Sequence, residues 1–140
     1  MRVASAFLIL TLAAACGPAE EEDMTPAGPT LADFAGTWQS SAMLEGVEDA
    51  VPSTLAGSAD GAWTMTLEGR DPIPATAMVH GDSLVMETEE YESVLRAGVM
   101  VSIRTAAVLQ DGILVGNLVA SYRTPDGVEQ VPGTIRGSRQ

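Results

Sequence analysis

Several residue types that carry chemistry are scarce in this chain of 140 residues, and each scarcity excludes a class of function. All seven cationic side chains are arginine, so neither a lysine Schiff base nor a lysine that clamps a phosphate is possible. The single cysteine excludes an intramolecular disulfide framework and a zinc site built from several cysteines. The 19 acidic residues give a net charge of −12, which argues against nucleic acid because phosphate contacts need clustered cations. The length fits one folded domain.

The first 15 residues contain the longest apolar run and have the layout of an export signal. Arg2 is a short cationic start, residues 3–12 form the apolar region, and residues 13–15 are three alanines at the expected cleavage site. The apolar stretch is about 13 residues long, whereas a helix that spans a bilayer needs about 20. We therefore expect residues 1–15 to be a signal peptide and not a permanent transmembrane helix.

Cys16 follows this leader directly, and residues 12–16 (Leu-Ala-Ala-Ala-Cys) resemble the lipobox of bacterial lipoproteins. In the common lipobox Leu stands three residues before the cysteine; here that position is Ala13, and Leu12 lies one residue earlier. The resemblance implies that Cys16 becomes the first residue of the mature chain and carries several acyl chains, such as palmitate, that anchor it stably to a membrane. Gly17 stands where an Asp favours inner-membrane retention in enteric bacteria, which favours the periplasm-facing outer membrane. The alternative is a cysteine that lies by chance beside an ordinary cleavage site.

Residues 16–30 are expected to link this anchor to the folded domain. After Cys16 the segment contains three prolines, two glycines and an acidic run at 20–23. Such a composition cannot bury enough apolar surface to offset the entropy of ordering, so we predict a flexible tether. Cation binding by the acidic run is the alternative.

The remaining residues, 31–140, show the alternation typical of β-strands. In residues 63–68 the odd positions are apolar and the even ones polar, and in residues 99–104 the odd positions are again all apolar. Turn signals at 80–82, 110–112 and 124–127 separate such runs and favour hairpins. The predicted strands span residues 36–44, 47–51, 62–68, 75–80, 83–89, 99–109, 113–123 and 129–139. We therefore predict an all-β, antiparallel up-and-down meander of about eight strands, closed into a small barrel because closure removes exposed edges.

Two short segments are compatible with a helix. Thr30 is suited to cap one helical turn at residues 31–34. Residues 89–96 are compatible either with a helix or with a connection before Gly98. Neither alternative changes the predicted class.

The ends of this domain resemble the lipocalin, or calycin, pattern. Residues 34–38 open the first strand with Gly36, one residue and Trp38, and the last strand contains Arg136 and Arg139. In lipocalins the tryptophan closes the barrel floor and an arginine of the last strand packs across it, which gives a cation–π contact. Because Arg139 shares the inward face of Ile135 while Arg136 does not, the resemblance pairs Trp38 with Arg139.

The resemblance extends over nearly all of residues 33–139. Residues 91–98 and 112–116 are similar to stretches of small lipocalin-like domains in bacterial exported proteins and lipoproteins. At 110 residues the domain is shorter than a typical lipocalin and lacks the usual C-terminal helix. An interior filled by side chains is therefore an alternative to a ligand pocket. The side chains expected inside include Met65, Leu67, Leu84, Met86, Val101 and Ile103, and core packing is also the expected role of Met78 and Met100.

Candidate catalytic and metal-binding groups are few. His80, Asp82 and Ser83 are the residue types of a hydrolytic triad, but neighbours in one tight turn cannot converge on one another, so a hairpin tip is the preferred interpretation. The acidic run from Glu87 to Glu92 offers carboxylates for calcium or for acid–base chemistry, and a solvated strand end is preferred. We expect no catalytic residue, no metal site and no cofactor.

Three functions remain in order of preference. The first is a non-enzymatic, membrane-anchored module that binds a small apolar ligand inside the barrel. The second is an envelope structural or protein-interaction domain with a filled core, and the third is an enzyme with carboxylates in the barrel mouth. We expect a monomer that contacts the membrane through Cys16 and binds no nucleic acid.

Overall fold

The computed structural model describes residues 28–140, so the expected signal peptide, Cys16 and most of the expected tether lie outside the described residues. The elements in chain order are α1 (Leu31–Phe34), β1 (Gly36–Leu44), β2 (Val51–Gly57), β3 (Ala62–Leu67), β4 (Ile73–His80), β5 (Ser83–Thr88), β6 (Tyr91–Glu92), β7 (Met100–Gln110), β8 (Ile113–Thr124) and β9 (Gly127–Arg139). Among the helices of residues 28–140, none has the length and apolar character needed to cross a membrane.

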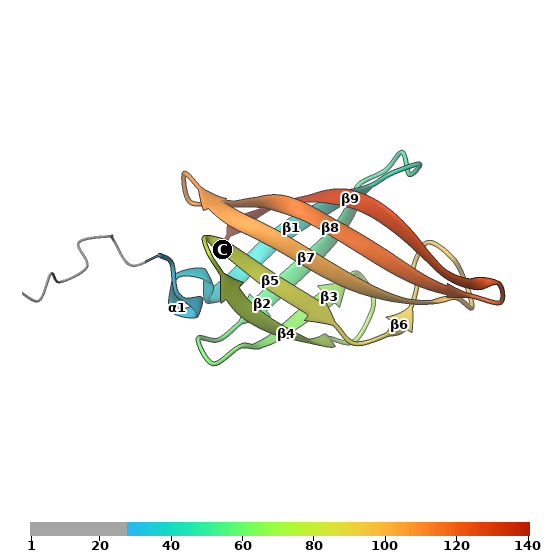
Figure 1. The fold of residues 1–140 in the computed structure, drawn as a ribbon, viewed down its shortest axis with the longest axis horizontal. Coiled ribbons are helices and arrows are strands. Elements are labelled where there is room, and N and C mark those ends of the chain that lie inside the picture. The colour runs from blue at the N-terminus through green and yellow to red at the C-terminus, as the bar shows by residue number, and fades with distance from the viewer. Residues whose placement is uncertain (1–27) are drawn as a thin grey trace, which may run out of the picture.

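Eight of these strands form a closed antiparallel barrel (Figure 1). Each strand pairs with its neighbours in the order β1, β2, β3, β4, β5, β7, β8 and β9. Pairing of β9 with β1 and of β5 with β7 closes the ring, while the two-residue strand β6 pairs only with the start of β7. The predicted all-β meander and its closure into a barrel are therefore confirmed.

The strand predicted at residues 47–51 is wrong. Residues 45–50 form the connection after β1, and the strand β2 begins at Val51 and runs to Gly57. Pro52 interrupts the apparent pattern in the sequence, but it lies before Ser53, the first residue that pairs with β3. A missing backbone N–H is tolerated at such a position near the start of a strand.

The two segments with helical potential differ in the structure. Residues 31–34 form α1, and the backbone N–H of Thr30 donates to the carboxylate of Asp33 at 2.6 Å, which ties the start of the helix. Residues 89–96 contain β6 and a turn, so the interpretation as a connection is correct there. Gly98 ends this connection with a φ of +76°, a conformation that other residues rarely adopt.

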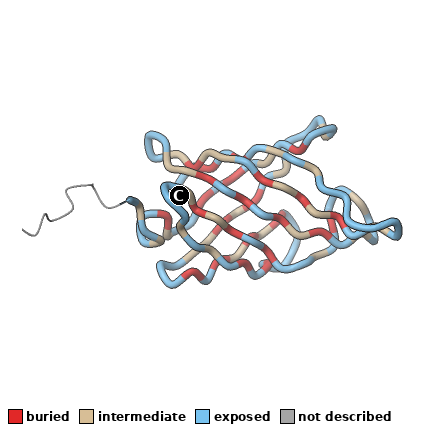
Figure 2. The backbone as a smooth tube through the Cα atoms, viewed as in Figure 1, coloured by how far each residue is buried: buried red, intermediate tan, exposed pale blue. Residues whose placement is uncertain are grey.

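The barrel interior is built by alternate residues of each strand, as the red and pale blue alternation in Figure 2 shows. The side chains expected inside are confirmed as buried, at 8% exposure or less: Met65, Leu67, Leu84, Met86, Val101 and Ile103. The expectation for Met78 and Met100 is wrong, because these residues are 63% and 38% exposed. Both lie at even positions of strands whose odd positions face inward, so the pleat points them outward.

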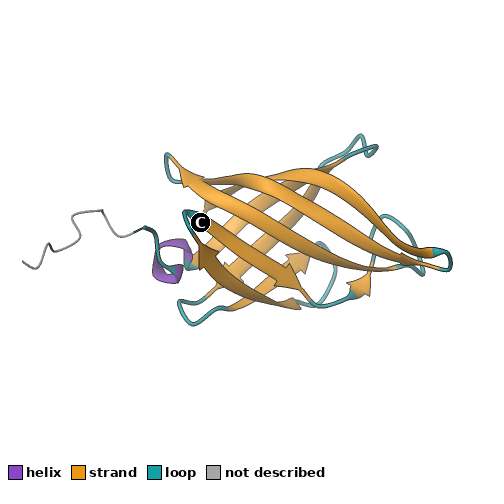
Figure 3. Cartoon of the chain, viewed as in Figure 1, coloured by secondary structure: helices purple, strands orange, loops and turns teal. Residues whose placement is uncertain are grey.

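One end of the barrel is closed by α1 and the start of β1 (Figure 3). Phe34 and Trp38 are fully buried there, and the indole N–H of Trp38 donates to the carbonyl of Phe34 at 2.8 Å. The guanidinium of Arg139 lies 4.3 Å from the centroid of the Trp38 ring and donates to the carbonyls of Ala35 and, at 2.8 Å, Asp33. This end, which we call the floor, is therefore held by apolar packing and by a cation–π contact.

Candidate functional site

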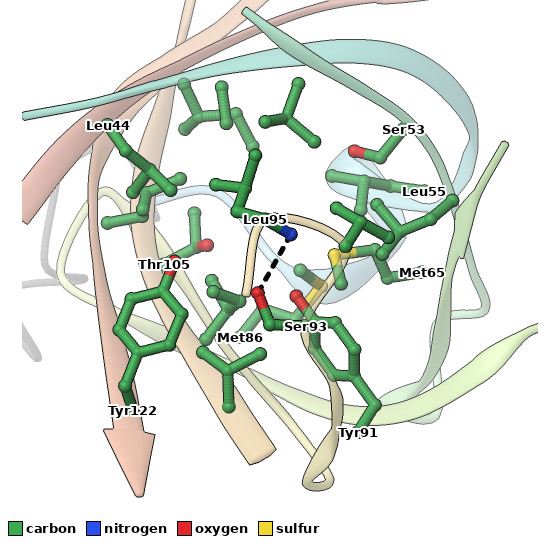
Figure 4. A pocket seen from close by; sticks show the side chains of 18 residues that line it. Leu44, Ser53, Leu55, Met65, Met86, Tyr91, Ser93, Leu95, Thr105 and Tyr122 are labelled. Atoms are coloured by element: carbon green, nitrogen blue, oxygen red, sulfur yellow. Dashed lines mark hydrogen bonds between the residues drawn. The ribbon is translucent and has the colours of Figure 1, made fainter. Parts of the chain in front are cut away.

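The barrel interior contains a cavity of about 50 Å³ between the floor and the opposite end, which we call the mouth (Figure 4). Its wall is mostly apolar and takes residues from β1, β2, β3, β5, β6, β7, β8 and β9. Leu55, which is paired with Trp38 in the strand register, lines the cavity, whereas Trp38 does not. The cavity therefore ends above the floor.

Thr105 is the unusual residue of this wall. It lies on β7, its pairing partners are Met86 on β5 and Leu118 on β8, and all three residues line the cavity. The residue is 2% exposed, and its Oγ1 atom has no hydrogen-bond partner. A buried hydroxyl without a partner is uncommon and costs free energy, since the water it has lost is not replaced.

Another buried hydroxyl of the wall, that of Ser53, has a partner. Ser40 and Ser53 are paired across β1 and β2, and their hydroxyl oxygens are 2.7 Å apart. The Ser40 hydroxyl also lies 3.1 Å from the Ser53 carbonyl, to which it is placed to donate. In the ring of eight strands β2 and β7 are four steps apart in either direction, so Ser53 and Thr105 lie on opposite walls.

Two tyrosines line the cavity near the mouth. Tyr91 comes from β6 and Tyr122 from β8, and Figure 4 shows both rings extending inward from their strands. Burial, and to a lesser degree the proximity of Tyr122, raises the pKa of Tyr91 to about 12. The phenol of Tyr91 is therefore a neutral hydrogen-bonding group near neutral pH.

Residues 93–98, which we call the strap, cover part of the mouth. Ser93, Val94 and Leu95 line the cavity, and Val94 and Leu95 also line an outer groove together with residues 46–50 of the β1–β2 connection and the first two residues of β2. The strap is tied within itself, because the backbone N–H groups of Leu95 and Arg96 each donate to the Ser93 hydroxyl at 3.1 Å. Val94 and Leu95 remain 43% and 41% exposed.

Three arginines connect the strap and the residues before it to the rest of the barrel. Arg96 forms an ion pair with Glu129 of β9 at 2.8 Å, and its guanidinium lies 4.1 Å from the ring centroid of Tyr122. Arg123 of β8 forms an ion pair with Glu90, and Arg70 donates to the carbonyl of Glu92. The hydrogen bond from Arg96 lowers the pKa of Glu129. These ties are exposed, so each contributes little by itself and is weakened by salt.

The candidate residues of the sequence are not brought together into a catalytic or metal site. His80 and Ser83 are paired at the turn between β4 and β5, and His80 is exposed. Glu90 is engaged by Arg123, and the Glu92 carboxylate accepts the N–H of Gly98 at 3.0 Å. Among residues 28–140 no group of three or more His, Cys, Asp and Glu side chains is placed to hold a metal ion.

Trp38 and Arg139 lie at the floor, below the cavity, so they close the barrel and do not line the pocket. The sequence reasoning missed Thr105 and the strap. Thr105 had a signal: it is the polar residue in the inward series Val101, Ile103, Thr105 and Ala107 of one strand. The ties made by Arg70, Arg96 and Arg123 had no such signal, because their partners are 22 to 33 residues away in the chain.

Comparison with known proteins assigns the chain to no family. No family model matches the chain, and no curated protein shows significant similarity to it. A solved structure of a rhizavidin–biotin complex aligns with a TM-score of 0.47 and 14% identity, over 80% of this chain and 98% of that one.

Proposed function

We propose that this chain is a non-catalytic, lipid-anchored protein of the bacterial envelope that binds a small apolar molecule inside its barrel. The observation that carries this proposal is the apolar cavity beneath the strap, with the unpaired Thr105 hydroxyl in its wall. Pockets that bind small molecules combine a mostly apolar lining with a few placed polar groups, and this cavity has that composition.

The size of the cavity sets a condition on binding. An engineered apolar cavity that binds benzene has a volume of about 150 Å³, and the space here is about 50 Å³. A ligand as large as benzene therefore enters only if part of the wall moves. Leu95 and Val94 are the half-exposed members of that wall, so their displacement costs less apolar burial than displacement of Leu55 or Met86.

The test is a titration of the full chain with toluene, in which binding is monitored by NMR of the methionine methyl groups. We expect the signals of Met65 and Met86, which line the cavity, to shift, while Met78 on the outer surface serves as an internal control. Leu95→Ala removes part of the wall at the mouth and should bind toluene more tightly. Val128→Ala, at a 66% exposed residue of β9, should leave binding unchanged. Unshifted Met65 and Met86 signals in both the wild type and Leu95→Ala would exclude this function.

A filled core with a protein partner at the mouth is the second candidate. The small volume of the cavity favours it, and so does the distribution of exposed large apolar side chains. Five of the six lie on the strap or on strand segments toward the mouth, namely Met43, Val94, Leu95, Met100 and Val128. If a protein partner binds at the mouth, Met100→Glu should abolish retention of an envelope protein in a pull-down, whereas Met78→Glu should not. A pull-down with no partner above background would count against it.

We place the lipid anchor on Cys16 and expect it to hold the barrel by its floor. Gly28, the first described residue, lies against Gly81 and Asp82 at the turn between β4 and β5, and α1 follows at the same end (Figure 1). An anchor attached through residues 16–30 therefore reaches the barrel at its floor, and the mouth lies at the far end.

A further inference from the structure

We propose that the ligand of this barrel is an uncharged molecule with an apolar body and one hydrogen-bonding group, and that Thr105 binds that group. This inference rests on the proposed function, because it names the chemical class of molecule for the same cavity. The combination that carries it is an unpartnered hydroxyl, 2% exposed, in the wall of a mostly apolar cavity.

Thr105 differs from the other buried hydroxyl residues of the described chain. Ser40 and Ser53 bond to each other, the Thr88 hydroxyl accepts the backbone N–H of Ile103 at 2.9 Å, and the Ser93 hydroxyl accepts two backbone N–H groups of the strap. Within residues 28–140, Thr105 is therefore the one buried serine or threonine whose hydroxyl has no partner. Since buried polar groups are almost always bonded, its partner is expected to come from what occupies the cavity.

The position of Thr105 fixes the orientation of a ligand. Its register partners Met86 and Leu118 are at the same depth, well below Val101, which is paired with Tyr91 at the mouth. A polar group that reaches Thr105 must therefore enter first, with the apolar body extending upward past Val101 and Tyr122 toward Leu95. The Ser53 hydroxyl on the opposite wall is already bonded to Ser40, so of these two hydroxyls only that of Thr105 lacks a partner.

The charges around the cavity exclude a charged ligand. The residues that line the cavity include neither a cationic nor an anionic side chain, so a charge placed inside would be desolvated without a partner. The outer groove beside the strap carries Glu48, Asp49 and Glu68, which repel anions at the mouth. A carboxylate ligand is therefore disfavoured inside the cavity, where no cationic side chain lines the wall.

Water is the competing partner for Thr105. A space of about 50 Å³ is large enough for a few water molecules, since one needs about 10–15 Å³. A ligand hydroxyl would take over the hydrogen bond of such a water, whereas a methyl group would displace it without replacement. If Thr105 binds a ligand hydroxyl, it should favour that ligand over one of equal shape that carries a methyl group instead. If water alone is its partner, it should not favour either ligand.

The experiment compares phenol, toluene and benzoate by calorimetric titration of the full chain. Phenol and toluene have nearly the same shape and differ in the hydroxyl, while benzoate adds a negative charge. We expect phenol to bind about tenfold more tightly than toluene, from one added hydrogen bond. Benzoate should bind at least tenfold more weakly than phenol, because its charge would be buried without a partner.

Two variants assign this preference to Thr105. Thr105→Val should bind phenol and toluene equally, and Thr105→Ser should restore the preference for phenol because it restores the hydroxyl. Equal binding of phenol and toluene by the wild type, or a preference that persists in Thr105→Val, overturns this inference and leaves the proposed function standing. Binding of benzoate as tight as that of phenol overturns the statement that the ligand is uncharged. If neither phenol nor toluene binds to the wild type or to Leu95→Ala, the proposed function fails as well.

Discussion

Two buried threonines on adjacent strands predict opposite responses to the same substitution. Thr88 and Thr105 are 5% and 2% exposed, on β5 and β7. The Thr88 hydroxyl accepts the backbone N–H of Ile103 at 2.9 Å, whereas the Thr105 hydroxyl has no partner. Substitution by valine replaces the hydroxyl with a methyl group of similar size, so the two variants differ mainly in the hydrogen bond that is lost.

The magnitudes follow from what each substitution leaves behind. Thr88→Val leaves the N–H of Ile103 unpaired in the barrel wall, which costs about 1–3 kcal/mol of unfolding free energy. Thr105→Val removes a desolvated group that is already unpaired, so it should raise the unfolding free energy by up to about 1–3 kcal/mol. The methyl group also adds apolar burial, which acts in the same direction.

Urea unfolding of the wild type and both variants, followed by tryptophan fluorescence, measures this difference. Unchanged slopes with denaturant would show that the midpoints report stability alone. A Thr105→Val variant that is destabilised as much as Thr88→Val would refute the reasoning, since the Thr105 hydroxyl would then have a strongly bound partner in the ligand-free barrel.

Three further predictions concern the anchor, the floor and the mouth. Cys16→Ser should move the protein from the membrane fraction to the soluble fraction on cell fractionation, and persistence in the membrane would contradict the lipid assignment. Trp38→Ala should lower the unfolding free energy by about 3–5 kcal/mol, because it removes a fully buried indole beneath Arg139. Near-unchanged thermal stability would contradict the role of Trp38 in closing the floor. Because the pKa of Tyr91 is raised from 10.0 to about 12, the folded barrel holds the phenol proton more tightly than the unfolded chain does. Stability should therefore be constant with respect to this group below pH 10 and fall between pH 10 and about 12, and Tyr91→Phe should lack this contribution in urea unfolding at several pH values. An identical loss in Tyr91→Phe would assign the effect to other groups.

The strand pattern followed from local rules, and closure of the barrel was expected because it removes exposed edges. The two-residue period of apolar side chains marks a strand with one buried face, and Asp111 and Gly112, both at positive φ, supply the backbone that a tight hairpin needs. The same parity argument placed Arg139 on the face of Ile135. Arg139 lies over Trp38, its pairing partner in the register of β1 and β9.

Predictions from the local sequence pattern were wrong in two situations. In one, the two-residue period of a strand was interrupted; in the other, the apolar character of a residue did not determine whether it faces the barrel interior or the solvent. Pro52 and the short apolar run before it shifted the predicted second strand to residues 47–51, although pairing with β1 and β3 fixes it at Val51–Gly57. Met78 and Met100 are apolar but have outward parity, so they lie on the surface. In both cases the register with neighbouring strands, and not the character of single residues, determined the outcome.

The sequence by itself determined the class of fold and the inward face of most strands, because these depend on alternation and turn chemistry within a few residues. The pairing of Trp38 with Arg139 was expected from the resemblance to lipocalins. The tertiary structure alone decided how much of the interior is empty, that the Thr105 hydroxyl is unpaired, and that Arg70, Arg96 and Arg123 tie the strap region across the mouth. The physical reason is that cavity volume and hydrogen-bond satisfaction depend on side chains from strands far apart in the chain. Their packing is fixed only when the ring of eight strands closes.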